Sequence, residues 1–497
     1  MKVIRALSRL LPVLVCLMPG VAAADIGPEN VLLLWNSEQP DSQAVRDAYV
    51  ARHPGVREFD LDDGTIPFGT IGRNGYNNRI LAPLRDFING VTTGEDISSE
   101  IMVIVTTRGI PGRINGDDEM ELFSTWCSLE SELSLLQQDL ESSQGVTPFL
   151  PSRTSGPIDN PYHLFNSGVP IENFNRSQIK TPRNWVAVNG PGGAQMFRVQ
   201  GMTPGNYYLV CRLDAAPTDV GESTEITAVE HVINMLDRSQ NLIIGKCDVQ
   251  ALLDEFGAAN QLDDDGFSPL YPARDDFGLT AAELSSNGWD VTHDETNNFV
   301  FQAELADPLK PLIVFGSYGE NHDIGAGEDP PGEGVYAESY LYHPGCVFVS
   351  YESFNGESIV TGLPRGGQQQ ALDFISAGGT FTIPTVKEPF TFPQADLEFF
   401  VVNFYERGFT FAEAAYMAMP ALSWQSVPIG DPLARAQVFD TINPDLTADG
   451  LVDPRDLYAY FAAPLDVNCD NEVDENDAYD MRDAVRRNES TTVVNRD

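Results

Sequence analysis

Two twelve-residue stretches near the C-terminus carry oxygen-bearing side chains at the same loop positions. In both, positions 1, 3, 5, 9 and 12 are Asp, Asn or Thr, and position 7 is free to differ because it would contribute its backbone carbonyl. Calcium is a hard cation that takes about six to eight oxygen ligands, and this spacing wraps a chain around it. The predicted ligands are Asp445, Thr447, Asp449, Leu451, Asp453 and Asp456 in loop one, and Asp466, Asn468, Asp470, Glu472, Asp474 and Asp477 in loop two.

Other features of the two stretches fit this interpretation. Position 6 needs positive φ, which Gly450 adopts freely and Asn471 tolerates better than most residues. Thr447 is a weaker ligand than Asp or Asn, so we expect loop one to bind calcium more weakly. Apolar residues at helical spacing follow each loop and predict two short helices that pack on each other: Leu457, Tyr460 and Phe461, then Ala478, Met481 and Val485. Chance carboxylates in a disordered acidic tail would not produce this repeated register.

The segment 445–487 resembles the duplicated loop–helix unit of type I dockerins, with Asp at position 12 of both loops and a helix directly after it. The resemblance implies Ca²⁺ as the cofactor and docking to a cohesin-like protein on a scaffold or cell surface. It departs from the family in the short spacing between the repeats and in Thr447. Positions 10 and 11, where that family sets partner choice, are Pro454-Arg455 and Glu475-Asn476, which do not identify a partner.

The chain before the tail is typical of strands alternating with helices. Continuous apolar runs at 31–35, 101–105, 311–315 and 346–350 predict strands buried on both faces. We expect helices at 41–52, 78–89, 129–140, 228–238, 249–256, 368–377, 395–407 and 410–419. This alternation predicts an α/β fold with a doubly wound, mostly parallel sheet over 25–436, interrupted by a Pro- and Gly-rich insertion near 147–205. A small all-α dockerin-like domain at 437–490 and a disordered segment at 491–497 complete the expected organisation.

Several segments, among them 29–36, 104–111 and 429–433, look like an uncharacterised family of secreted bacterial proteins. The closing Gly430-Asp431-Pro432 and the order of strands also resemble gingipain-like cysteine peptidases of the caspase-like fold. In those enzymes a His follows one buried strand and a nucleophilic Cys follows the next. The resemblance implies that His322, after the strand at 311–315, is a general base, with Asp323 or Glu320 as its orienting group.

The next strand departs from the peptidase pattern. Cys346 stands at its expected beginning, which would put the thiol at the opposite end of the sheet from His322. The end of this strand offers Ser350 and Ser353 instead, and Ser353 is the predicted nucleophile of a peptidase-like or other acyl hydrolase. Two alternatives stay open: a polysaccharide-degrading glycosidase, which is the usual passenger of a dockerin and would use a carboxylate pair drawn from Glu320, Asp323 and Glu352, and a non-catalytic surface-assembly protein.

Four charged residues, Arg108, Arg113, Arg212 and Asp214, follow or end predicted strands. They would form either a charged substrate cleft or an internal ion-pair network, and the second interpretation is favoured because buried pairs use the same residue types. Neither His231 nor His343 lies in an HExxH or similar zinc-binding pattern, so the sequence does not predict catalytic zinc.

Composition and the first residues bear on compartment and partners. A basic start, an apolar run at 10–18 and the small residues at 22–24 predict a secretory signal peptide over 1–24, and no later stretch is apolar for long enough to span a membrane. We therefore expect a secreted, extracellular or cell-surface protein. The 73 acidic residues outnumber the 30 basic ones, giving a formal charge of −43 that excludes nucleic-acid binding. The few, widely spaced cysteines leave room for one disulfide bridge.

Overall fold

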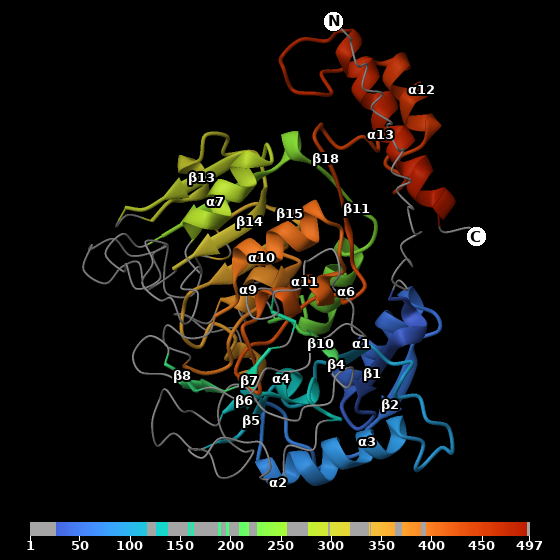
Figure 1. The fold of residues 1–497 in the computed structure, drawn as a ribbon, viewed down its shortest axis with the longest axis vertical. Coiled ribbons are helices and arrows are strands. Elements are labelled where there is room, and N and C mark those ends of the chain that lie inside the picture. Colours follow the sequence, from blue (N-terminus) through green and yellow to red (C-terminus); the bar gives the residue numbers. More distant parts are fainter. Residues whose placement is uncertain are drawn as a thin grey trace, which may run out of the picture.

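A computed structural model describes most of the chain between residues 26 and 494 (Figure 1). The described residues are 26–116, 126–137, 158–160, 162–163, 187–189, 195–197, 208–217, 226–255, 277–296, 299–318, 337, 339–362, 370–388 and 394–494. The predicted signal peptide, 1–24, lies outside them. Within these ranges no helix combines the length and the apolar character needed to cross a bilayer.

The first sheet is parallel and has the order β10-β4-β1-β2. Its strands are β1 (Val31–Trp35), β2 (Arg57–Asp60), β4 (Val103–Thr107) and β10 (Leu209–Leu213). Alternate side chains enter two different apolar cores, as they must on a pleated strand. Leu33 packs in the core that contains α1 (Pro40–Arg52) and α6 (Ala228–Arg238), whereas Leu34 packs in the core that contains Leu84 and Leu129. Helices therefore cover both faces of this sheet.

The second core comes from a long broken helix and a short one. The broken helix consists of α2 (Arg73–Tyr76), the π-helix η2 (Asn77–Leu81) and α3 (Ala82–Ile88), and the short helix is α4 (Leu129–Leu133). The sequence predicted a helix at 78–89, and the observed helical stretch starts five residues earlier. For the predicted helix at 129–140, only 129–137 lie within the described residues, and α4 ends at Leu133.

The second sheet is also parallel and has the order β13-β12-β14-β15-β16. Its strands are β12 (Gln250–Asp254), β13 (Val291–Asp294), β14 (Leu312–Ser317), β15 (Tyr342–Ser350) and β16 (Phe381–Thr382). The helices packed around it are α7 (Phe277–Ser286), α8 (Ser358–Thr361), α9 (Ala371–Ser376), α10 (Leu397–Val401), the π-helix η11 (Val402–Glu406) and α11 (Phe411–Ala418). In each sheet the second strand in sequence lies on one side of the first, and the later strands are added on the other side. This change of direction is the arrangement of doubly wound folds.

The predicted helix at 249–256 is wrong, because this segment forms β12. Ala251, Leu252 and Leu253 are all fully buried, so the run has no polar face that would distinguish a strand from a helix. Parallel pairing with both β13 and β14 makes β12 a central strand, which explains why it is apolar on both sides.

The two sheets are joined edge to edge by the segment around Ile429. Ile429 bridges Arg212 of β10 in parallel and Thr382 of β16 antiparallel. Two residues later, the buried Asp431 pairs with Nε2 of His53 at 2.7 Å, at the end of α1. The closing Gly-Asp-Pro motif is thus a structural joint between the two halves of the body.

Two small sheets complete the body. One has the order β3-β5-β6, with β3 (Thr70–Ile71), β5 (Arg113–Ile114) and β6 (Cys127–Ser128). The other has the order β17-β7-β9-β8, with β17 (Ala421–Leu422), β7 (Ile158–Asp159), β9 (Gln195–Phe197) and β8 (Ala187–Asn189). The described parts of the predicted insertion thus pair with each other and with β17, outside both large sheets.

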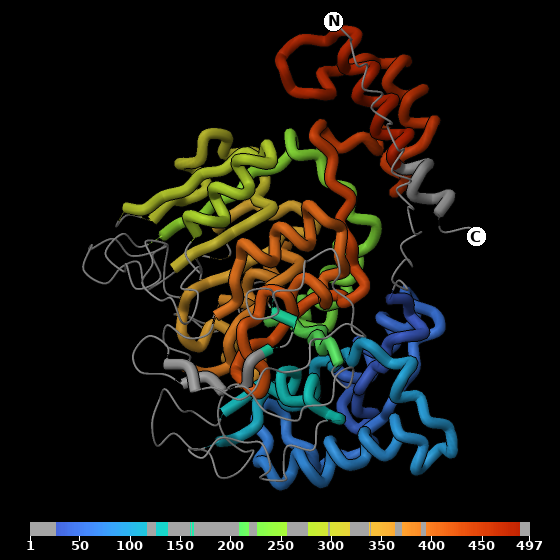
Figure 2. Tube along the Cα trace, in the orientation of Figure 1, coloured from blue at the N-terminus to red at the C-terminus, as the bar shows by residue number. Residues whose placement is uncertain are grey.

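The chain reaches its C-terminal tail through a two-stranded parallel ladder of β11 (Leu242–Gly245) and β18 (Ala436–Phe439). Two helices follow, α12 (Pro454–Ala462) and α13 (Glu475–Val494), which stand together beyond the body (Figures 1 and 2). Tyr460 and Met481 are buried between them as predicted, but Phe461 is 60% exposed. Because α13 continues to Val494, the first part of the expected disordered segment 491–497 is helical, and 495–497 lie outside the described residues.

Candidate functional site

The two predicted calcium loops have the same hydrogen-bond scheme at position 1. In loop one the carboxylate of Asp445 accepts hydrogen bonds from the backbone N–H groups of positions 5 and 6, Asp449 (3.1 Å) and Gly450 (2.8 Å). In loop two Asp466 accepts the equivalent bonds from positions 5 and 6 at 3.2 and 2.8 Å. Each loop therefore closes on its first carboxylate.

The carboxylate at position 12 is buried in both loops. Asp456 accepts hydrogen bonds from the N–H groups of Thr447 (2.9 Å) and Asp453 (2.8 Å), at positions 3 and 9. Asp477 accepts the equivalent bonds at 3.2 and 2.8 Å. Burial acts to raise the pKa of Asp477, but hydrogen bonds from backbone N–H groups outweigh it and hold that pKa below its ordinary value. This carboxylate is therefore ionised at neutral pH, as a metal ligand must be.

The backbone turns are also the same in the two loops. Position 6 has positive φ, +81° at Gly450 and +68° at Asn471, as the sequence predicted. Position 4 has positive φ as well, +54° at Ala448 and +62° at Cys469, although neither residue type favours it. The two stretches thus adopt one loop conformation, and each loop leads directly into a helix.

The loops differ in how their negative charge is compensated. Arg455 lies on loop one, with Nη1 at 2.6 Å from Asp449 and Nη2 at 2.6 Å from Asp453, the ligands predicted at positions 5 and 9. In loop two, no Lys or Arg of the described ranges pairs with Asp466, Asp470, Glu472, Asp474 or Asp477. From the sequence, Arg455 was considered only as a residue at a position that sets partner choice. Its role as a counter-ion to the predicted calcium ligands Asp449 and Asp453 was missed.

A disulfide ties loop two to the body. Cys469, at position 4 of the loop, is bonded to Cys247, which lies in the short 3-10 helix η7 (Lys246–Asp248) after β11. Backbone contacts reinforce the junction: the N–H of Asn443 donates to Asp248 (2.5 Å) and the N–H of Cys247 donates to the carbonyl of Thr441 (3.2 Å). The single bridge allowed by the sequence is present, although its partners could not be assigned from spacing.

The proposed catalytic residues are only partly within the described ranges. His322 and Asp323, and Glu320 with them, lie outside, so their distance to Ser353 is not defined. Ser353 is half-buried, and its Oγ donates a hydrogen bond to Glu388. Ser350, at the end of β15, hydrogen-bonds Glu352 in a buried pair.

Cys346 occupies the middle of β15 instead of its beginning. The residue is fully buried, and burial raises the pKa of its thiol well above the ordinary value. Because a thiolate is the reactive form of cysteine, Cys346 is not a nucleophile in this conformation. The sequence-based conclusion that this cysteine does not fill the peptidase role is therefore supported by a different reason, burial inside the sheet.

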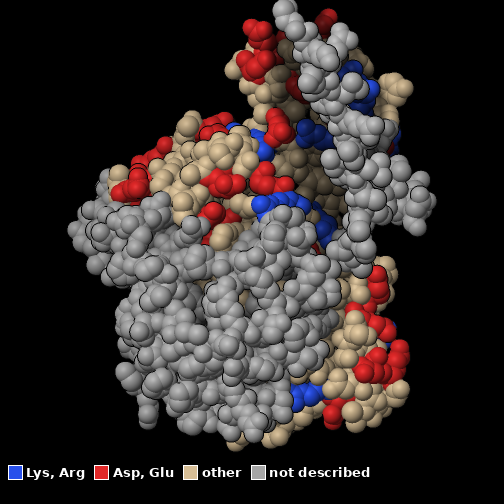
Figure 3. Space-filling model, in the orientation of Figure 1, with Lys and Arg blue, Asp and Glu red and all other residues tan. Residues whose placement is uncertain are grey.

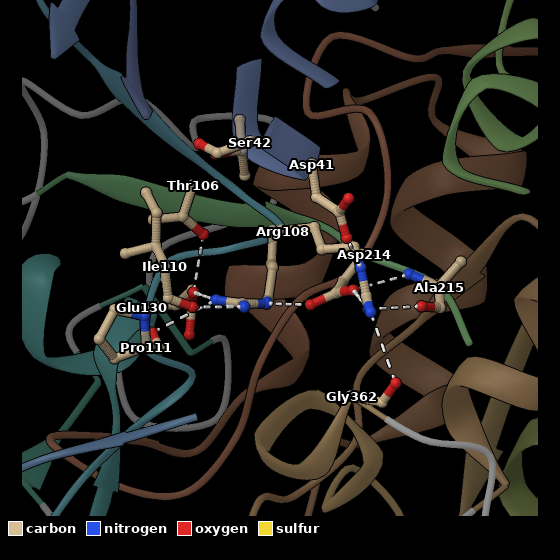
Figure 4. A network of polar contacts seen from close by, with 12 residues as sticks. Asp41, Ser42, Thr106, Arg108, Ile110, Pro111, Glu130, Asp214, Ala215 and Gly362 are labelled. Carbon is tan, nitrogen blue, oxygen red and sulfur yellow. Dashed lines mark hydrogen bonds and ion pairs between the residues drawn. The ribbon is translucent and has the colours of Figure 1, made fainter. Parts of the chain in front are cut away.

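The charged residues that end the strands of the first sheet form an internal network (Figure 4). Asp214 is shared by two arginines: Nε of Arg212 lies 2.8 Å from Oδ2, and Nη1 of Arg108 lies 2.9 Å from Oδ1. Arg212 also pairs with Glu130 at 3.0 Å, and none of Arg212, Asp214 and Glu130 is exposed. The structure therefore agrees with the favoured interpretation, an ion-pair network, and not with a charged substrate cleft at Arg212.

Arg113 is tied down in a similar way. Its Nη1 donates to the carbonyl of Val386 at 2.8 Å, and its guanidinium lies over the ring of Trp126 at 4.8 Å from the ring centroid. Only a small part of the side chain reaches solvent, 11%. Its polar contacts are with the protein itself.

The surface of the tail is strongly acidic. Figure 3 shows Asp and Glu side chains, with some Lys and Arg side chains among them, over the tail and over the part of the body beneath it.

No family model, curated protein or solved structure matches the chain.

Proposed function

We propose that residues 445–487 bind two calcium ions and that the loaded helix pair attaches the α/β body to an extracellular protein partner. The observation that carries this proposal is the identical hydrogen-bond scheme of the two loops, in which buried carboxylates at position 12, Asp456 and Asp477, are oriented by the N–H groups of positions 3 and 9. Two loops with the same ligand spacing and the same scheme are expected to take the same ligand. The donor set is made of carboxylate, amide, hydroxyl and carbonyl oxygens, which is the set that calcium prefers.

Charge supports the same assignment. Loop two gathers six carboxylates within twelve residues, and its Asp477 is completely buried. Carboxylates gathered this closely repel one another unless a cation compensates their charge. A divalent cation held by Asp466, Asp470 and Asp477 would supply that compensation and would bring the loop and α13 together.

The docking role rests on apolar side chains that the tail leaves exposed. On α12, Tyr458 is 75% exposed and Phe461 is 60% exposed, and on α13 Tyr479 is 49% exposed. Exposed aromatic residues on an otherwise acidic surface are typical of protein–protein contact sites. The dockerin resemblance names a cohesin-like protein as the partner.

Isothermal titration calorimetry on the calcium-stripped full chain tests the metal sites. We expect two equivalents of bound calcium, one of which is lost in Asp445→Asn and the other in Asp466→Asn. Asp480→Asn, on α13 outside the loops, is the matched control and should retain both. If the stripped protein bound no calcium, or if neither loop variant changed the stoichiometry, the proposal would be wrong.

Surface plasmon resonance against a panel of cohesin domains, in calcium and in chelator, tests the docking role. We expect binding only in calcium, and at least about tenfold weaker binding for Tyr458→Ala, because truncating a central aromatic anchor typically costs more than 1 kcal/mol. Binding that persisted unchanged in chelator would contradict a calcium-dependent interface.

The activity of the α/β body is a separate proposal. The caspase-like resemblance and the polar residues at the carboxyl ends of β14 and β15, Ser317 and Ser350, favour a hydrolase whose site lies at that edge. A polysaccharide hydrolase and a non-catalytic assembly protein remain the alternatives. Loss of hydrolysis in His322→Ala, measured against peptide and glycan substrates, would favour catalysis, whereas partner binding without turnover would favour assembly.

A further inference from the structure

Three side chains with metal-binding chemistry meet at the carboxyl end of the second sheet. In the parallel pair of β12 and β13, Leu253 lies opposite His293 and Asp254 lies opposite Asp294. The N–H of Glu255 donates to the carbonyl of Asp294 at 2.8 Å, which continues the ladder by one residue. Because side chains alternate along a strand, Glu255, His293 and Glu295 project from the same face.

The donor atoms of these residues are close together. Nε2 of His293 lies 2.8 Å from a carboxylate oxygen of Glu255, and one ligand atom from each of the three residues lies within 4.8 Å of the others. Ligands bound to one tetrahedral zinc ion at about 2.0–2.1 Å are roughly 3.4 Å apart. Small side-chain rotations would therefore bring all three donors onto one ion.

The charges of this cluster favour a divalent cation. Glu255 is 9% exposed, and neither it nor Glu295 pairs with a Lys or Arg of the described ranges. Two carboxylates and a neutral imidazole balance the charge of a divalent ion, whereas leaving a buried carboxylate without a cation is costly.

The geometry points to a divalent transition-metal site, with zinc as its simplest occupant, formed by Glu255, His293 and Glu295. An imidazole among the ligands selects zinc or a similar ion over calcium, which binds oxygen alone. Three protein ligands leave at least one coordination position of the metal for water or another ligand. Glu295 is exposed, so the cluster is open to solvent on that side. The site lies next to the switch point between β12 and β14, where doubly wound sheets bind ligands.

The competing explanation is an ion pair between protonated His293 and Glu255, which has the same geometry without a metal. A zinc titration distinguishes the metal site from the ion pair. The tag-free full chain is first stripped of metal and is then kept in excess calcium, which blocks the C-terminal loops. We expect one equivalent of zinc to bind. Cobalt in place of zinc should give the visible absorption bands of a protein-bound ion with nitrogen and oxygen ligands.

Variants decide the assignment. Glu295→Gln changes an exposed residue and should weaken zinc binding at least about tenfold without loss of folding, and His293→Ala should abolish binding at this site. His343→Ala, at a histidine outside the cluster, is the matched control and should leave the zinc affinity unchanged. If the wild-type chain took up no zinc in excess calcium, the site would be an ion pair only. The same conclusion would follow if Glu295→Gln and His293→Ala both took up as much zinc as the wild type. Even if the C-terminal loops bound no calcium, the comparison of these variants with the wild type would separate this site from the loops.

Discussion

Cys247 of the α/β body is covalently bonded to Cys469, the fourth residue of loop two, across a sequence separation of 222 residues. The disulfide lies beside the β11–β18 ladder and beside an apolar cluster in which Ile243 and Phe439 from that ladder meet Val452 and Val467 from the loops. The tail is therefore mounted on the body through covalent, hydrogen-bonded and apolar contacts.

We predict that removing this bond weakens both the fold and loop two. The double variant Cys247→Ser and Cys469→Ser should lose about 2–4 kcal/mol of unfolding free energy, because a long loop of the unfolded chain is no longer closed. Without the bond the backbone at position 4 of loop two is no longer fixed to the body, so the loop is held less rigidly. Calcium affinity at loop two should therefore fall, while loop one is unaffected. Denaturant unfolding and calcium titration measure the two effects. Reductant should reproduce both effects in the wild type and have none in the double variant; equal calcium affinities with and without the bond would contradict the coupling.

Arg455 is predicted to compete with calcium in loop one. Its guanidinium holds Asp449 and Asp453, and because the side chain is 58% exposed, solvent screening keeps these ion pairs weak. Arg455→Gln should therefore raise calcium affinity at loop one by about two- to fivefold, as calorimetry on the Asp466→Asn background would measure. Arg486→Gln, an exposed arginine of α13 outside the loops, is the control. A lower affinity in Arg455→Gln would mean that the guanidinium supports the loop instead of competing for its ligands.

Much of the sheet could be predicted from sequence, because strands buried on both faces leave continuous apolar runs. The run at 31–35 has the same bounds as β1, and the run at 311–315 became β14 with a small shift of its ends. The segment 249–256 failed because an apolar run of that length has the same pattern in a strand and in a buried helix. Its neighbours, β13 and β14, decide in favour of a strand, and they are distant in sequence.

The two candidate metal centres show the same limit. The loop ligands lie within twelve residues, so their spacing alone predicts a site. His293 and Glu255 are 38 residues apart and meet only through the pairing of β12 with β13, so no local pattern could connect them. His231 and His343 lie in no HExxH pattern, but such a local pattern cannot detect metal ligands that only the pairing of strands brings together.

The buried Arg212 network is predicted to be a large contributor to stability. Arg212→Met leaves Glu130 and Asp214 without their shared cation in a fully buried position, which should cost about 3–5 kcal/mol in urea unfolding. Adding Glu130→Gln should recover part of the loss, because Asp214 keeps Arg108 as a partner.

A surface pair provides the comparison for that experiment. Arg46 pairs with Glu58, and both side chains are about 30% exposed, so Arg46→Met should cost less than about 1 kcal/mol. If Arg212→Met were no more costly than Arg46→Met, the buried network would have to be compensated by water or by rearrangement.

His163 is predicted to make the protein sensitive to mild acid. Its ring is fully buried near Phe399, neither nitrogen has a hydrogen-bond partner in the described part of the chain, and burial lowers its pKa to about 3. The unfolded state takes up a proton near pH 6.5 and the folded state does not, so stability falls as pH drops from about 6.5 toward 3, by about 2 kcal/mol at pH 5. His163→Phe should remove that part of the slope when unfolding free energies are measured at pH 7 and pH 5 in saturating calcium. An equal pH dependence in variant and wild type would show that His163 is protonated within the fold.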